Sequence, residues 1–144
     1  MRRLSGLAVV VPVALLLLIG AAPVVAATRT AVSITVTTIF DPNPDGFTAT
    51  GIPACSAGWV SDGGAHVQFA RPIGVFAGYK VFDCGGGTGF VLRLNARFGS
   101  EGSTGSLSVV DSWGAVAGLT GAGKLTGTPI DGGILDTYQG AVTR

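Results

Sequence analysis

Two aspartates occupy positions where a carboxyl group could do chemistry. Each lies on the more apolar face of an alternating segment, which is expected to point inward: Leu107, Val109, Asp111 and Trp113 in one segment, Ile134, Asp136, Tyr138, Gly140 and Val142 in the other. A buried carboxylate is costly unless it is hydrogen-bonded or paired, so each predicts a partner or a raised pKa. We therefore predict that Asp111 and Asp136 line a ligand cavity as an acid, a base or a polar anchor, together with Trp113 and Tyr138. The alternative is that each aspartate only accepts backbone N–H groups at a strand end.

Two glycine-rich segments resemble nucleotide-binding motifs but lack essential parts. Residues 118–125 nearly match the phosphate-binding P-loop, but Leu125 stands where the motif needs a Ser or Thr hydroxyl for Mg²⁺. The residues from Lys124 onward also have strand and turn character, whereas a P-loop opens a helix. Residues 85–89 are likewise typical of a turn. We predict no nucleotide and no cofactor.

The remaining reactive side chains do not form a known catalytic or metal-binding pattern. His66 is the single histidine, expected on the polar face of its strand, and no serine lies in a G-x-S-x-G elbow. A Ser-His-Asp hydrolase is therefore not favoured. Glu101, the only glutamate, lies in a polar loop. Two distant cysteines and His66 are too few ligands for a zinc site, so we predict no metal.

The first 27 residues predict export. A short basic start precedes an apolar run over 7–27 that ends in small residues, which fits cleavage after Ala27. The alternative is an uncleaved anchor, because the run is long enough to span a bilayer. We predict a signal peptide over 1–27, a domain over 28–144, and a secreted or cell-envelope location. Contact with a membrane is expected only through an uncleaved leader.

Export places both cysteines in an oxidising compartment, where a disulfide between Cys55 and Cys84 is the expected state. The closed loop of about 30 residues would stabilise the fold by about 3–4 kcal/mol in the chain-entropy model.

The mature chain has the composition of a β protein without a basic face. Removing the two leader arginines leaves seven Lys and Arg against eight Asp and Glu, a net charge of −1. This argues against a nucleic-acid binder. Twenty-four glycines and one methionine argue against a helical bundle.

Short alternating segments separated by turn residues predict about eight strands at hairpin spacing. They cover 31–39, 47–52, 66–71, 78–84, 90–98, 106–113, 122–128 and 134–143. Sequential hairpins favour a single antiparallel meander, and closing it into a barrel removes exposed edges. A barrel of this size has room for its own side chains or one small ligand.

The segment WGAVAGLTGAG from Trp113, followed by DTYQG from Asp136, resembles secreted bacterial proteins with the allene oxide cyclase barrel-like fold. Dirigent proteins share that barrel and a related glycine-rich hairpin. Cys55 and the Phe82-Asp83-Cys84 segment resemble the cysteine pair of the bacterial branch. The resemblance covers about residues 78–143 and implies an eight-stranded barrel.

The resemblance carries less information about activity. The cyclases hold an unstable epoxide in an apolar cavity near a buried glutamate, and Glu101 does not match that setting. Dirigent proteins steer radical coupling with aspartates in their cavity. The resemblance implies that Asp111 or Asp136 would be the counterpart of those aspartates. We expect a non-catalytic barrel that binds a small apolar ligand or a surface partner. The alternative is a cyclase- or dirigent-like protein that acts on a small apolar molecule in the barrel cavity.

Overall fold

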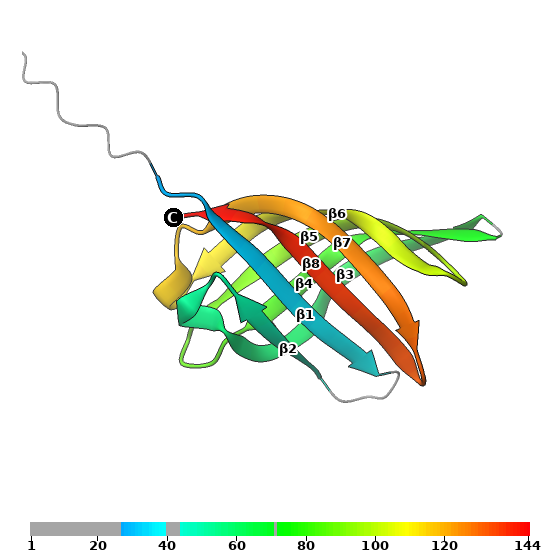
Figure 1. The fold of residues 1–144 in the computed structure, drawn as a ribbon, viewed down its shortest axis with the longest axis horizontal. Helices are drawn as coiled ribbons and strands as arrows, with labels where there is room; N and C mark the ends of the chain where they lie inside the picture. The colour runs from blue at the N-terminus through cyan, green and yellow to red at the C-terminus, as the bar shows by residue number, and fades with distance from the viewer. Residues whose placement is uncertain (1–26, 40–43, 71) are drawn as a thin grey trace, which may run out of the picture.

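The computed structural model describes residues 27–39, 44–70 and 72–144, so the predicted signal peptide lies outside the described residues except for Ala27. The described chain is all β, as predicted: eight antiparallel strands form a meander that closes where β1 pairs with β8 (Figure 1). The strands are β1 (Thr30–Ile39), β2 (Asp45–Thr50), β3 (Ala57–Ala70), β4 (Ile73–Asp83), β5 (Gly89–Gly99), β6 (Gly102–Trp113), β7 (Thr120–Ile130) and β8 (Gly133–Thr143). Within these ranges, no helix has the length and apolar character needed to cross a membrane.

Strand β5 shows how alternation builds the barrel wall. Leu92, Leu94 and Ala96 are buried, while Arg93 and Asn95 between them are exposed. This is the two-residue period expected of a strand with one face in the core and one in water. The strand predicted over 90–98 is therefore present and has one face in the core.

Strand β3 is longer than the sequence predicts, because it begins at Ala57 rather than at His66. Its first half contains glycine, serine and aspartate, which are depleted in strands. Pairing with β4 along almost its whole length overrides this local preference, and the ladder shifts register between Asp62 and Ala65. The two glycines at this irregularity, Gly63 and Gly64, fit a bulge.

The end of the barrel near the start of β1 and the C-terminus is filled by aromatic rings. Phe82 stacks on Phe90 with ring centroids 4.7 Å apart, and Phe47 meets Phe82 edge-on at 5.1 Å. The predicted disulfide is present at this end and joins Cys55 to Cys84, with their Cα atoms 5.2 Å apart. Two short 3-10 helices, η1 (Pro53–Cys55) and η2 (Gly114–Val116), contact each other here and cover the end. We call this region the packed half.

At the opposite end, the six-residue strand β2 covers only part of the much longer β3. β2 pairs with β3 only from Asp45 opposite Val60 to Thr48 opposite Ala57. Beyond Val60, β3 pairs only with β4 among the described residues. Figure 1 shows the β3–β4 and β7–β8 hairpins diverging from each other toward this end. We call this region the open half.

Candidate functional site

The open half contains a cavity of about 650 Å³. This size lies within the range of pockets that hold small molecules. Its wall is mostly apolar and is formed by residues of β3, β4, β5 and β7: Val67, Phe76, Leu94, Ala96, Phe98, Leu125 and Ile130. Ser100 in the β5–β6 turn and Gly133 at the start of β8 also line the cavity. The cavity is therefore a mainly apolar space in the open half of the barrel.

Small residues keep this part of the barrel empty. Gly127 on β7 is buried, and a Cβ atom there would collide with the Ser103 hydroxyl and the Asp136 carboxylate. Both side chains also line the cavity. Glycine at this position thus makes room for two polar groups in an otherwise apolar wall.

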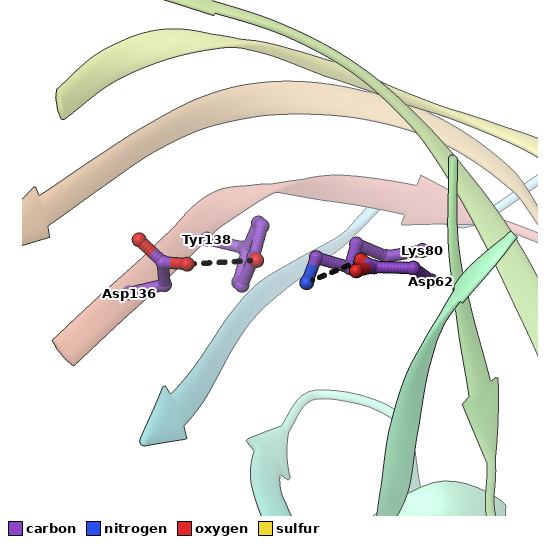
Figure 2. A network of polar contacts seen from close by, with 4 residues as sticks. All are labelled: Asp62, Lys80, Asp136 and Tyr138. Atoms are coloured by element: carbon purple, nitrogen blue, oxygen red, sulfur yellow. Dashed lines mark hydrogen bonds and ion pairs between the residues drawn. The ribbon is translucent and has the colours of Figure 1, made fainter. Parts of the chain in front are cut away.

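Asp136 and Tyr138, both on β8, line the cavity at the boundary with the packed half. The Tyr138 ring is 2% exposed and packs edge-on against Phe82 at 5.9 Å. Its hydroxyl donates to Asp136 Oδ2 at 3.4 Å (Figure 2), which is long for a strong O–H···O bond. Burial raises the pKa of the Asp136 carboxyl; the Lys80 charge and the Tyr138 hydroxyl partly oppose that rise. Burial and then the Asp136 charge raise the pKa of Tyr138, so its hydroxyl stays a donor.

Among the described residues that line the cavity, Lys80 on β4 is the one with a positive charge. Its side chain is 15% exposed and forms an ion pair with Asp62 Oδ1 at 2.7 Å, across the β3–β4 ladder (Figure 2). Asp62 is 66% exposed, so water screens this pair. Neither Lys80 nor Asp62 was predicted from the sequence as a site residue. The signal was available, because alternation places Lys80 on the same face as Phe76 and Phe82.

Asp111 does not face the cavity, and the prediction that it points inward is wrong. The pairing of β5 with β6 shifts so that Val91 lies opposite Asp111 and Leu92 opposite Val109. Val110 is the extra residue of a bulge, and both Val110 and Asp111 are exposed. Asp111 Oδ1 accepts the Ser112 backbone N–H at 2.8 Å. Its role in the structure is local, as the alternative interpretation held.

The same bulge corrects the prediction for Trp113, which does not line the cavity. The bulge changes the alternation of β6, and the hydroxyl of Ser112 accepts the N–H of buried Leu119 at 3.0 Å. The Trp113 indole lies against Gly89, its partner in the ladder, where a Cβ atom would collide with the ring. Trp113 therefore packs against β5 near the covered end.

The other reactive residues lie away from the cavity. His66 is exposed and its Nε2 is 3.0 Å from the Gln68 side-chain nitrogen. Glu101 is exposed in the β5–β6 turn. In residues 27–39, 44–70 and 72–144, no three His, Cys, Asp or Glu side chains are grouped so that they could hold a metal ion.

The cavity thus combines an apolar wall with a few polar groups at one level, an arrangement that can bind and orient a small molecule. No protein-family model, curated protein or solved structure matches the chain. The resemblance to the allene oxide cyclase-like and dirigent proteins stays a prediction. The function is accordingly inferred from the cavity alone.

Proposed function

We propose that this protein is a secreted or envelope-associated barrel that binds one small apolar molecule in its open half, without catalysis. The observation that carries the proposal is the cavity of about 650 Å³ with its mainly apolar wall. In the packed half, in contrast, the space lined by Phe90, Leu92 and Tyr138 is about 20 Å³. The disulfide supports export, because such bonds persist in oxidising compartments.

The proposal is tested with N-phenyl-1-naphthylamine, a neutral apolar probe whose fluorescence rises when it leaves water. The purified mature protein should bind it saturably, with one site per chain. Absence of saturable binding would overturn the proposed function.

Two phenylalanine substitutions on β5 locate the binding site. Ala96 is buried and lines the cavity, whereas the adjacent Asn95 is exposed on the outer face. Ala96→Phe should fill the cavity and abolish probe binding, while Asn95→Phe should leave it unchanged. Thermal unfolding of both variants shows whether the fold is kept, and Ser103→Phe fills the same cavity from β6 if Ala96→Phe unfolds. Equal probe binding by folded Ala96→Phe and wild type would contradict a site in the cavity.

A cyclase- or dirigent-like activity is a second candidate, favoured by the carboxyl and phenol of Asp136 and Tyr138 in the same cavity. Only one of the two predicted aspartates remains available to it, because Asp111 is exposed. This activity would change the stereochemistry of products formed from a phenoxy radical or an unstable epoxide. The change should disappear in Asp136→Asn. Racemic product with wild-type protein would exclude it for the reactants tested.

A further inference from the structure

Among the residues that the structure describes, no cation lies within ion-pair distance of the Asp136 carboxylate. The ion pair found among the described residues joins Lys80 to Asp62, so the nearby cation is already engaged by another carboxylate. Asp136 instead accepts one long hydrogen bond from Tyr138. A half-buried carboxylate in an apolar cavity is penalised unless a donor or a cation offsets its desolvation. Asp136 is therefore available to accept a hydrogen bond from a donor or cationic group of a ligand.

We call the inner end of the cavity, where Asp136 and Tyr138 lie, its floor. Among the described residues, the charged groups near this floor are mostly negative. Asp45 and Lys80 both act on the charge state of Asp136, and Asp45 and Asp62 act on Tyr138. In the part of the chain that the structure describes, these are three carboxylates against one ammonium group. A field of this sign attracts a cationic ligand and repels an anionic one.

Several acceptor atoms face the same space. A carboxylate oxygen of Asp136 and the Ser103 hydroxyl both lie at the empty Cβ position of Gly127. The Thr38 hydroxyl also belongs to a residue of the cavity lining, and its oxygen is buried without a hydrogen-bond partner in the described chain. An ammonium group carries three donors, an alcohol one, and an ionised carboxylic acid none. The ammonium group therefore matches the floor best.

We propose that the open half selects an apolar amine in its protonated form, with the ammonium group donating to Asp136 and the apolar body lying against the cavity wall. This inference rests on the proposed function and specifies the chemical class of its ligand. The driving force divides in two: the wall removes apolar surface from water, and the floor supplies a charge-assisted hydrogen bond. The apolar part gives affinity for many molecules, and the carboxylate gives the preference among them.

The test compares octylamine, octan-1-ol and octanoic acid, which share one apolar chain, as competitors that displace N-phenyl-1-naphthylamine at neutral pH. An alkylamine is protonated there, like a lysine side chain. Octylamine should bind at least about tenfold more tightly than octan-1-ol, the effect of a hydrogen bond to a charged group. Octanoic acid should bind most weakly. Octanoic acid binding as tightly as octylamine would overturn the inference.

Two Asp→Asn variants assign the preference to one carboxylate. Asp136→Asn should reduce the affinity for octylamine to about the affinity for octan-1-ol. Asp111→Asn makes the same chemical change on an exposed residue outside the cavity and should keep the full preference. An unchanged preference in Asp136→Asn would contradict the proposed role of this residue. The wild-type comparison of three ligands stands without the variant, should that variant fail to fold.

The two proposals fail in different ways. If wild-type protein does not bind the neutral probe, the proposed function is wrong. If it binds the probe but shows no preference for the amine, only the inference about ligand class is wrong.

Discussion

The packed half and the open half obey the same alternation of side chains but enclose different interiors. Near the disulfide, inward positions carry large rings such as Phe82 and Phe90, and a space of about 20 Å³ remains. Toward the β7–β8 turn, inward positions carry Ser103 and Gly127, and about 650 Å³ remains. The hydrogen-bonded ladder β7–β8 runs through both halves. The two halves therefore share one topology and differ in the pairing of β2 with β3 and in the side chains at some inward positions.

Truncating one aromatic ring in each half should give the largest difference in the free energy of unfolding. Phe82 is fully buried among three other rings, whereas Phe69 is 78% exposed and contacts Phe98. Phe82→Ala should lower the free energy of unfolding by about 3–5 kcal/mol, and Phe69→Ala by less than about 1 kcal/mol. Urea denaturation of both variants measures the difference. Equal losses would show that the two halves are not packed differently.

The disulfide should act on stability without shaping the cavity. Cys55 and Cys84 are separated by 29 residues and lie in the packed half. Replacing both with alanine should cost about 3–4 kcal/mol in the chain-entropy model, while the folded variant still binds the neutral probe. Denaturation and probe titration of the same sample test both parts. Loss of probe binding by a folded variant would show that the two halves are coupled.

Asp136 should make the free energy of unfolding of the protein depend on pH. Burial raises the pKa of its carboxyl above the usual value of 3.8, against the opposing effects of Lys80 and Tyr138, while the Asp45 charge adds to the rise. The folded protein thus holds this proton more tightly than the unfolded chain. Wild type should lose stability relative to Asp136→Asn as the pH rises from the unfolded-state pKa through the folded-state pKa, and the difference should then stay constant. Denaturation of both proteins across acid to neutral pH gives this difference, and a slope of opposite sign would contradict the burial of Asp136.

A methyl group added at Gly127 should give the smallest effect. It tests whether this glycine sets the position of the Asp136 carboxylate. The Cβ atom of Gly127→Ala would meet the ends of three flexible side chains, those of Ser103, Asp136 and Ile134. Because these ends can move, stability should change by less than about 1 kcal/mol, while octylamine affinity falls a few-fold. Competition against the neutral probe measures this change. Affinity equal to that of wild type would show that the Asp136 position is not set by this glycine.

Much of the fold could be predicted from the sequence, because alternation is a local property of each strand. The pattern of β8 predicted one inner face for Asp136 and Tyr138, and both line the cavity. The same rule failed in β6, since a bulge depends on pairing with β5 and leaves no distinct signal in the segment around Val110. One extra residue changed the faces of Asp111 and Trp113.

The cavity itself could not be predicted, because its volume depends on residues brought together from several strands. Nothing in the sequence around Gly127 distinguishes it from other strand glycines. Its role depends on Ser103 and Asp136, which the fold brings beside it. The Lys80–Asp62 pair likewise depends on the register of β3 against β4 across a bulge. Local patterns thus identify faces, while register and side-chain volume decide what those faces enclose.

The ligand site in the open half is tested most directly by an NMR titration. Mature ¹⁵N-labelled protein is titrated with N-phenyl-1-naphthylamine while the amide chemical shifts are followed. We predict saturable shifts concentrated at Leu94, Ala96, Phe98 and Tyr138, with little change around the disulfide. Shifts that never saturate, or that centre on the packed half or the outer face of the barrel, would contradict a ligand site in the open half.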